Sequence, residues 1–467
     1  MSLTPEKIYR EFTNNEIDKD SAITLLISLV ENVDNLDVRL DSIKTIQKLG
    51  FKSQRFFDLL ENLLISDDNQ DIRILAAWTL AKIFKNKSLK PLNWALNNET
   101  SMKYFLEITS IFTKINSEDA KKILIKKIED IDKLPFISSF NRLFSTHPLH
   151  TFGCKSLATI INNYFIIKYI EEKNVKFSYK LKNGLITELD LAHITSTVKG
   201  WEIIKNLSKF IDKFQELKKI SLKDDKIGTF PPNILSLSYL AHLNLSHNLL
   251  KQIPESIYRL QSLKFLDLRY NKIKLLPDTI GKLRLLRVLD LRHNKLMILP
   301  ASIGELESLE VLNLYGNQLE ELPSTLKQLK KLELGLNSLI NIPAYVKELN
   351  SLEKLGLGSN KNLENPSEWL ETIPSIKELN LSNINLNNLP ESIGYIQTLE
   401  SLTLNNNKLK KLPDSLKKLT FLKKLNLSWN NFSFLPDWIG CFSNLEELNL
   451  EGNKLNTLPK TLSSIPP

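Results

Sequence analysis

The sequence contains few cysteines and no long apolar run. Among its 467 residues are only two cysteines, Cys154 and Cys441, which lie far apart. Two such distant thiols form neither a disulfide framework nor a metal site, so we expect free thiols in a reducing compartment. Because no run of about eighteen apolar residues occurs, we expect no transmembrane helix. The polar start, MSLTPEKIYREFTNNE, lacks the apolar core of a secretory signal. These absences predict a cytoplasmic protein that does not enter a membrane.

The sequence also lacks the short motifs that carry catalysis. It contains no G-x-x-x-x-G-K-[ST], G-x-S-x-G, H-E-x-x-H or C-x-x-C segment. His242 and His247 are close in sequence, but no cysteine or carboxylate joins them at the spacing of metal ligands. We therefore expect no enzyme activity, no bound metal and no cofactor.

Neither sign of charge dominates the chain. Its 62 basic and 53 acidic residues leave a net charge of +9. One basic stretch, Lys121, Lys122, Lys126 and Lys127, follows Ser117, which has the residue type and position of a helix N-cap. This stretch is either a solvated helix face or a surface for nucleic acid.

Residues 1–173 are poor in glycine and proline and contain two similar segments. Leu36-Asp-Val-Arg39 leads to Leu49-Gly50, and Gln70-Asp-Ile-Arg73 leads to Ile83-Phe84, 34 positions later. Within each segment the apolar residues follow helical spacing. The D-(V/I)-R opening resembles the second helix of HEAT repeats. That resemblance implies stacked helical pairs in which Asp37 and Arg39 ladder with Asp71 and Arg73. A third unit lies around Tyr104 to Ile115. The alternative is an irregular helical bundle that serves only as a cap for the rest of the chain.

The remainder of the chain is built on a repeat. Leu263, Leu266, Leu268 and Asn271 recur 23 residues later as Leu286, Leu289, Leu291 and Asn294. A period of this length with the pattern L-x-x-L-x-L-x-x-N-x-L predicts a solenoid with one strand per unit. Eleven units begin at Leu217, Leu240, Leu263, Leu286, Leu309, Leu329, Leu352, Ile376, Leu399, Leu422 and Leu445. The shortest unit, which starts at Leu309, loses three residues from its convex half.

This pattern resembles the leucine-rich repeat family, in the subclass whose convex half reads L-P-x-x-I-x-x-L. The subclass is similar to Ras-binding scaffolds and Ras suppressors. The combination with a helical module resembles leucine-rich repeat proteins of archaea. The expected fold is therefore a HEAT-like α-solenoid followed by a leucine-rich repeat horseshoe with a parallel concave sheet.

A junction separates the two modules. Residues 174–191 alternate in polarity around Asn183-Gly184, a favoured hairpin turn, and should cover the first edge of the sheet. Val198 to Phe214 has helical spacing and should form a long convex helix. We thus predict a helical domain over 1–173, a capping hairpin and helix over 174–216, and eleven repeats over 217–467.

The repeated asparagine should form a ladder of amides between units, because an amide both donates and accepts hydrogen bonds. Asp225 and Ile384 interrupt this ladder in the first and eighth units. We expect a local irregularity near Ile384, where Asn383 or Asn385 could substitute.

The concave side chains form columns when each unit is numbered from its first leucine. Positions 3, 5, 7 and 8 should face outward from the sheet. In units two to five these columns combine apolar, aromatic and arginine side chains, the composition of binding hot spots. The candidate partner-binding residues are His242, Phe265, Asp267, Arg269, Tyr270, Val288, Asp290, Arg292, His293 and Tyr315. The alternative is that these residues only suit a strand, with Asp267 and Asp290 paired with the arginines across strands.

These features favour a non-enzymatic scaffold that binds a partner protein on its concave face. The resemblance to Ras-binding scaffolds implies a small Ras-like GTPase as that partner. The two alternatives are a nucleic-acid-binding protein that uses the helical domain and a regulatory subunit of an enzyme. The concave columns hold acidic and basic residues in similar numbers, which argues against a phosphate-binding groove there.

Overall fold

The computed structural model describes residues 3–131, 138, 148–326, 329–342, 346, 348–364, 368, 370, 373 and 376–464. The chain divides into two compact units. The first consists of residues 1–175, 180–187 and 209–215, and the second of 176–179, 188–208 and 216–467. The division at 173/174 and 216/217 stays a proposal from the sequence.

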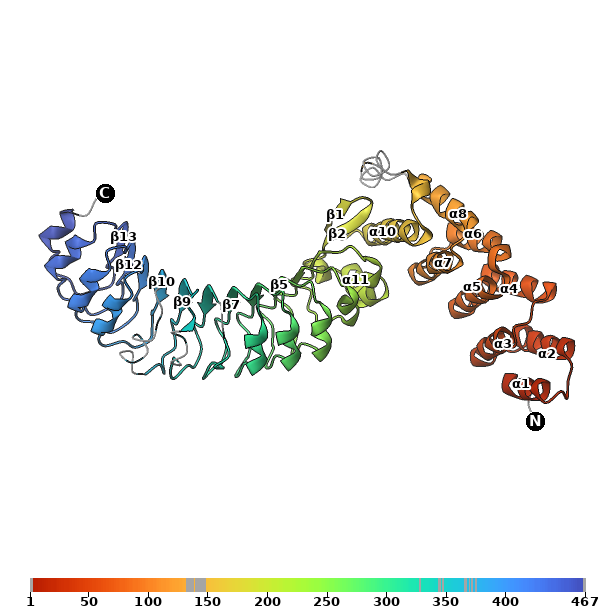
Figure 1. The fold of residues 1–467 in the computed structure, drawn as a ribbon, viewed down its shortest axis with the longest axis horizontal. Helices are drawn as coiled ribbons and strands as arrows, with labels where there is room; N and C mark the ends of the chain where they lie inside the picture. Colours follow the sequence, from red (N-terminus) through yellow and green to blue (C-terminus); the bar gives the residue numbers. More distant parts are fainter. Residues whose placement is uncertain are drawn as a thin grey trace. The chain divides into compact units, whose positions relative to one another are not determined.

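The first unit is an α-solenoid of helical pairs. Consecutive helices pack as α2 with α3, α4 with α5, α6 with α7 and α8 with α10, and α3, α5 and α7 lie along one side of the array (Figure 1). Side-chain caps such as Asn35, Ser53 and Ser117 begin several of these helices. The helices are α1 (Pro5–Thr13), α2 (Lys19–Asn32), α3 (Leu36–Leu49), α4 (Gln54–Ser66), α5 (Gln70–Phe84), α6 (Leu89–Asn98), α7 (Met102–Ile115), α8 (Glu118–Glu129) and α10 (Cys154–Glu172).

The expected ladder between Asp37, Arg39, Asp71 and Arg73 is wrong. Arg39 instead forms an ion pair with Asp67, and Arg73 lies 3.5 Å from Glu99. Asp67 and Glu99 are the C-cap residues of α4 and α6, which are the first helices of the next pairs. Asp71 points elsewhere, to Lys103 at 2.7 Å. Both arginines therefore pair with carboxylates at the ends of helices in the next pair, and the contact of Asp71 is with a lysine.

The second unit is organised around β3 to β13 of a sheet whose strands follow sequence order from β1 to β13. From β2 onward each strand pairs in parallel with the next, and equivalent leucines face each other, as Leu266 faces Leu289. β1 therefore lies at the first edge of the sheet, as expected from the hairpin predicted over residues 174–191. The strands are β1 (Ser178–Lys182), β2 (Leu185–Asp190), β3 (Lys219–Ser221), β4 (His242–Asn244), β5 (Phe265–Asp267), β6 (Val288–Asp290), β7 (Val311–Asn313), β8 (Lys331–Glu333), β9 (Lys354–Gly356), β10 (Glu378–Asn380), β11 (Ser401–Thr403), β12 (Lys424–Asn426) and β13 (Glu447–Asn449).

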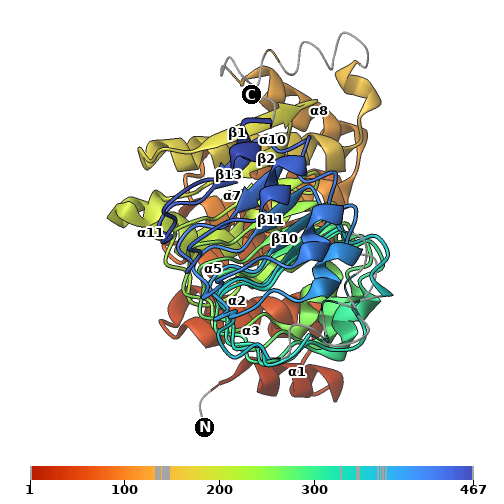
Figure 2. The ribbon, with the colours of Figure 1, turned by 90° about the vertical axis from the view of Figure 1, so that its left-hand side faces the viewer.

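β3 to β13 are the eleven predicted repeat strands. They line the inner side of the curve, and short 3-10 helices such as η7 (Glu255–Arg259) and η8 (Asp278–Lys282) line the outer side (Figure 1). Figure 2, which looks along the array, shows the strands stacked behind one another. Between the two sides lies the core, in which Leu268 and Leu291 are fully buried. Burial of such leucines is the main stabilising contribution to each unit.

In the unit that starts at Leu309, the three missing residues belong to the convex half, as predicted. Val311 of β7 faces Lys331 of β8 only 20 residues later, yet the two strands stay in register. Leu326 and Leu329 remain buried and fill the shortened convex half.

The long helix expected over Val198 to Phe214 is wrong. α11 (Val198–Asn206) ends early, and two 3-10 turns follow at Leu207–Lys209 and Ile211–Lys213. Phe210 and Phe214 are both fully buried, and Phe210 contacts Tyr169 of α10 edge-on at 6.4 Å. The tighter turns bury both of these rings.

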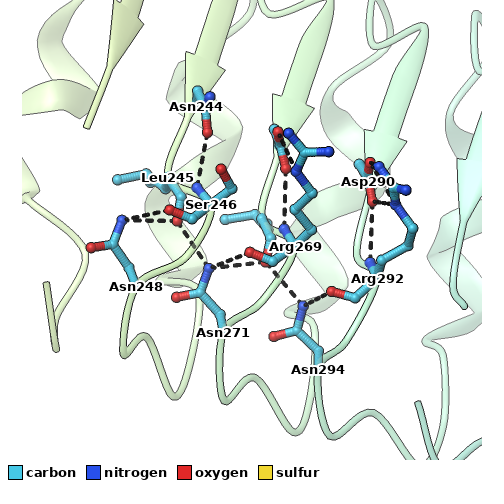
Figure 3. Close-up of polar contacts among 11 residues, drawn as sticks. Asn244, Leu245, Ser246, Asn248, Arg269, Asn271, Asp290, Arg292 and Asn294 are labelled. Atoms are coloured by element: carbon cyan, nitrogen blue, oxygen red, sulfur yellow. Dashed lines mark hydrogen bonds and ion pairs between the residues drawn. The ribbon is translucent and has the colours of Figure 1, made fainter. Parts of the chain in front are cut away.

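The asparagine ladder connects each unit to its neighbours, as predicted. Asn271 Nδ2 donates to the carbonyl oxygens of Leu245 and Leu268, each at 2.9 Å (Figure 3). Its Oδ1 accepts from the backbone N–H of Leu250 at 3.0 Å. Asn248 and Asn294 repeat this arrangement in the adjacent units (Figure 3). Each amide thus satisfies buried backbone groups that would otherwise be unpaired.

The irregularity predicted near Ile384 is confirmed. Asn383 and Asn385 both have positive φ, at 53° and 60°. Positive φ at the position of Asn383 is shared by other units, whereas among the described residues only Lys226 shares it at the position of Asn385. The expectation that Asn383 or Asn385 takes the place of the ladder asparagine is wrong. Asn383 donates to Ser359 Oγ and Asn385 to Lys361 O in the preceding loop. The same pair of left-handed residues, Asp224 and Lys226, flanks Asp225.

Candidate functional site

Position 5 of the strands has a structural role that the sequence did not reveal. Asn244 Oδ1 accepts a hydrogen bond from the backbone N–H of Ser246 at 2.9 Å (Figure 3). Asp267 and Asp290 accept equivalent bonds from Arg269 and Arg292, each at 3.2 Å. A short side-chain acceptor there closes the turn that comes after the strand. In the sequence, the recurrence of Asn or Asp at position 5 is the signal for this structural role.

Arg269 and Arg292 fold back onto the carboxylates of their own units. Arg292 makes a two-pronged contact with Asp290, with Nη2 2.7 Å from Oδ2 (Figure 3). Arg269 Nε lies 3.2 Å from Asp267 Oδ2 as an ion pair, although this nitrogen has no hydrogen bond to a described residue. The pairing across strands that we considered is therefore wrong. Each guanidinium is held in place within one unit and remains about one-third exposed, at 31% for Arg269 and 35% for Arg292.

These contacts and their burial shift the pKa values of Asp267 and Arg292. Burial raises the pKa of Asp267, against the lowering by its hydrogen bond from the Arg269 backbone. The hydrogen bond to Asp290 raises the pKa of Arg292, which keeps this side chain charged. The positive charges of Arg269 and Arg292 are therefore partly neutralised by the neighbouring carboxylates of Asp267 and Asp290.

Position 8 carries a stack of rings. His247 and Tyr270 lie 4.4 Å apart between ring centroids with 19° between their planes, and Tyr270 and His293 lie 4.4 Å apart with 20°. Tyr315, from position 7 of the next unit, meets His293 edge-on at 5.4 Å. Tyr270 is 45% exposed and Tyr315 36%. The stack is therefore accessible along its length.

The stacked residues have a backbone conformation that normally favours glycine. Their φ angles are 57° for His247, 54° for Tyr270 and 52° for His293. The left-handed region costs a non-glycine residue about 1–2 kcal/mol. Every unit from β2 to β13 has positive φ at this position, in His193, Asp224, His247, Tyr270, His293, Gly316, Leu336, Ser359, Asn383, Asn406, Trp429 and Gly452.

Gly316 shows why the stack ends where it does. A Cβ at this residue would lie 2.7 Å from His293 Nδ1, so the imidazole lies directly against the glycine. Gly316 and Gly452 were the sequence signals for this conformation, because glycine adopts positive φ readily. His247 belongs to the stack but was not among the candidate residues, since only its position in the column pointed to it.

Position 3 supplies a second apolar column beside the stack. The rings of His242 and Phe265 lie parallel at 4.3 Å, and Val288 and Val311 continue the column on β6 and β7. Burial lowers the pKa of His242 and of His247, so both imidazoles are neutral at neutral pH. These rings therefore present an uncharged surface.

The composition of position 3 changes after unit five. Lys331 and Lys354 both lie near Glu333, at 3.7 and 3.6 Å, and Lys354 also pairs with Glu378 at 2.8 Å. This network of ion pairs borders the ring residues on the C-terminal side. The ten candidate residues are thus all in one continuous region of β4 to β7 and the turns after these strands.

Two kinds of feature are absent from the described residues. No group of three or more His, Cys, Asp or Glu side chains there could hold a metal ion. No helix in the same residues has the length and hydropathy needed to cross a membrane. Cys154 is buried and Cys441 exposed, and both are free thiols.

Comparison with known proteins supports the repeat assignment. The family model for a leucine-rich repeat region matches residues 278–371 and 360–464, and that for a leucine rich repeat matches 215–273. No curated protein matches the chain. A leucine-rich repeat protein of Leptospira interrogans is 28% identical with a TM-score of 0.44, over 64% of this chain and 90% of its own.

Two plant receptors are also similar. The Arabidopsis receptor kinase HAESA, solved with the peptide hormone IDA and the co-receptor SERK1, is 30% identical with a TM-score of 0.47. The match covers 58% of this chain and 46% of that one. The ectodomain of GASSHO1/SCHENGEN3 from Arabidopsis thaliana, in complex with CASPARIAN STRIP INTEGRITY FACTOR 2, is 28% identical with a TM-score of 0.45, over 55% of this chain and 35% of that one.

The repeat pattern, the parallel sheet with its asparagine ladder and the two family matches agree with one another. Repeat solenoids of this kind present extended concave surfaces and serve as protein–protein interaction modules. The chain belongs to the leucine-rich repeat proteins.

Proposed function

We propose that this protein is a non-enzymatic scaffold that binds a partner protein on the concave face of units two to five. The contact region is the ring surface, which we define as His242, His247, Phe265, Tyr270, Val288, His293 and Tyr315. Arg269 and Arg292 lie within it. The observation that carries the proposal is the stack of His247, Tyr270 and His293 on left-handed backbone.

The stack has little value for stability alone. An aromatic pair contributes about 0.5–1.5 kcal/mol beyond its buried area. The left-handed backbone costs about 1–2 kcal/mol for each residue that is not glycine. These magnitudes nearly cancel, and glycine occupies the same position in Gly316 and Gly452. Exposed rings that contribute so little net stability favour a role in binding over one in folding.

The chemistry of the ring surface suits a protein partner. Exposed tyrosine and arginine side chains are the residues that most often dominate binding energy at protein interfaces. Arg269 and Arg292 are already held by Asp267 and Asp290, so these two side chains lose little conformational entropy on binding. We propose a small Ras-like GTPase as this partner, on the resemblance of the L-P-x-x-I-x-x-L half to Ras-binding scaffolds.

The test compares the wild-type protein with Tyr270→Gly in a binding titration against small GTPases and in an affinity pull-down. Glycine should leave the fold intact because φ at Tyr270 is 54°. Asn406→Gly is the matched control, because Asn406 has the same position and a φ of 56° outside the ring surface. We expect Tyr270→Gly to lose the partner and Asn406→Gly to keep it. If Tyr270→Gly and the folded double variant Arg269→Glu with Arg292→Glu both retain every partner, the ring surface is not the binding site.

The alternative of nucleic-acid binding rests on the lysines of α8. Ser117 caps this helix as predicted, with Oγ 3.2 Å from the N–H of Ala120. Lys121 and Lys122 already lie 3.8 and 3.0 Å from Glu118 and Asp119, which reduces the charge they offer to phosphate. Binding through phosphates would weaken steeply with added salt, whereas binding to the ring surface would change little. A regulatory subunit would differ in changing the turnover of its partner enzyme.

A further inference from the structure

A cavity of about 540 Å³ lies on the helical unit and is lined by residues of α3, α5 and α7 and of the turn after α5. Figure 1 shows these three helices along one side of the unit. Its walls include Trp78, Ala81 and Lys82 of α5, Lys85 just after that helix, and Lys114 and Ile115 at the end of α7. Pockets that bind small molecules usually measure roughly 300–1,000 Å³. This open cavity is therefore large enough to hold a small organic ligand.

The charge of the cavity has one sign. Lys82 and Lys114 are in the last turns of α5 and α7, and Lys85 begins the 3-10 turn η1 (Lys85–Ser88). No carboxylate is among the described residues that line the cavity. Within the described chain these three lysines take part in no ion pair, in contrast to Lys121 and Lys122 on α8. An anion would therefore meet three ammonium groups that have no competing partner there.

Trp78 supplies an apolar wall beside these charges. Its indole Nε1 donates to Glu107 Oε2 at 2.9 Å, which fixes the orientation of the ring. The half-buried ring lines the cavity together with Ala81 and Ile115. A flat ring or an aliphatic body could pack against this wall while its anionic groups contact the lysines.

Lysines at helix C-termini often only complement the helix dipole. Lys85 has that position too, because it is the C-cap residue of α5, on a backbone with φ 46° and ψ −124°. One observation goes beyond that role. Lys48, which corresponds to Lys82 in α3, lies over the ring of Tyr9 at 3.9 Å, whereas Lys82 and Lys114 face an open cavity.

We propose that this cavity binds a small organic anion that combines a flat ring with phosphate or carboxylate groups, the chemistry of a mononucleotide. The lysines contact the anionic groups and Trp78 packs against the ring. This site is on the helical unit and is independent of the ring surface, so failure of one proposal leaves the other untouched.

Isothermal titration of the full-length protein with Mg²⁺-free ADP and with benzene-1,3,5-tricarboxylate tests the proposal and separates the two anion types. We expect at least one to bind, and its affinity to fall at least tenfold in Lys82→Glu with Lys114→Glu and in Lys85→Glu. If ADP binds, adenosine and pyrophosphate, its two halves, should each bind at least tenfold more weakly. Trp78→Leu should then weaken ADP and leave pyrophosphate unchanged.

The matched control is Lys122→Glu with Lys126→Glu, which changes the same charge on α8 outside the cavity. Far-ultraviolet circular dichroism and the melting temperature establish that each variant is folded. The proposal is overturned if neither anion binds the wild-type protein, or if the control pair lowers the affinity as much as the cavity variants. It is also overturned if folded Lys85→Glu and the cavity double variant both bind normally.

Discussion

The rings of Tyr270 and His293 lie nearly parallel, with centroids 4.4 Å apart and 20° between their planes. The two residues are 23 positions apart in sequence and occupy the same position of neighbouring units. Both have left-handed backbone, which turns their side chains out of the strand direction and into line with each other. The ring surface therefore depends on a strained conformation repeated in register.

Replacement of Tyr270 by glycine should be less destabilising than replacement by alanine. Both variants lose the ring contacts, but only glycine removes the left-handed strain, so Tyr270→Gly should be more stable by about 1 kcal/mol. Urea unfolding measures the difference. Val288 is the control, because it lies in an extended strand, where glycine should be less stable than alanine. Equal stability of the two Tyr270 variants would contradict the strain assigned to this position.

Asp225→Asn should stabilise the protein at neutral pH. Asp225 is fully buried, its Oδ1 accepts from the N–H of Thr195 at 3.1 Å, and its Oδ2 has no hydrogen-bond partner among the described residues. Burial raises its pKa from 3.8 to about 6. An asparagine there could donate to a strand carbonyl as Asn248 does to Leu222, at 2.7 Å.

The sign of the pH dependence comes from this shift. A carboxyl group with a raised folded-state pKa is neutral in both states below pH 4, and folding is then not penalised by its charge. Between about pH 4 and 6 the unfolded state loses the proton first, so the wild-type protein loses about 3 kcal/mol of stability. The stability gain of Asp225→Asn should thus grow from pH 4 to 6 and stay constant above, as measured by urea unfolding at each pH. A gain independent of pH would show that Asp225 is not the titrating group.

Asn407→Ala should destabilise the protein more than Asn430→Ala. Asn407 Oδ1 accepts from two backbone N–H groups, those of Ile384 at 3.1 Å and Leu386 at 3.0 Å. Asn430 Oδ1 accepts from Leu409 at 3.0 Å. Because an orphaned buried donor costs about 1–3 kcal/mol, we expect a difference of at least about 1 kcal/mol between the variants in chemical unfolding. Equal losses would mean that the N–H of Ile384 finds another acceptor.

Asp67→Ala should destabilise the helical unit far more than Asp71→Ala. The ion pair of Asp67 and Arg39 is largely buried, with side chains 7% and 20% exposed, and loss of one partner of a buried pair costs about 3–5 kcal/mol. The pair of Asp71 and Lys103 is about half exposed, at 56% and 49%, and should contribute under about 1 kcal/mol. Thermal unfolding followed by circular dichroism separates the two. A comparable loss in both variants would contradict the assignment of the larger contribution to the buried pair.

Periodic residues allowed the array to be predicted well. Leu266, Leu289 and Asn271 occupy positions that recur because every unit needs the same buried side chain or amide. The pattern of one unit therefore predicts the others. The in-register sheet and the hairpin at its first edge followed from that repetition. The convex helix after Val198 failed because burial of Phe210 and Phe214 outweighed helical spacing.

The candidate site was predicted as columns of residues, without the contacts between them. The columns predict Asp267 and Asp290 as binding residues, but their side chains also accept bonds from the backbone of their own turns. The stack of His247 with Tyr270 depends on a positive φ that only Gly316 and Gly452 signalled. A sequence column shows which residues share a face but does not give the rotamers that bring rings to 4.4 Å.

The sequence by itself determined the repeat, its strand and its asparagine ladder, because these depend on residue type at a fixed local spacing. The tertiary structure alone decided that Arg39 binds Asp67, that Arg292 folds onto Asp290 and that one buried oxygen of Asp225 has no hydrogen-bond partner in the described part of the chain. A long polar side chain can reach several possible partners. Which partner it contacts depends on distances and burial that are defined only once neighbouring units have packed together.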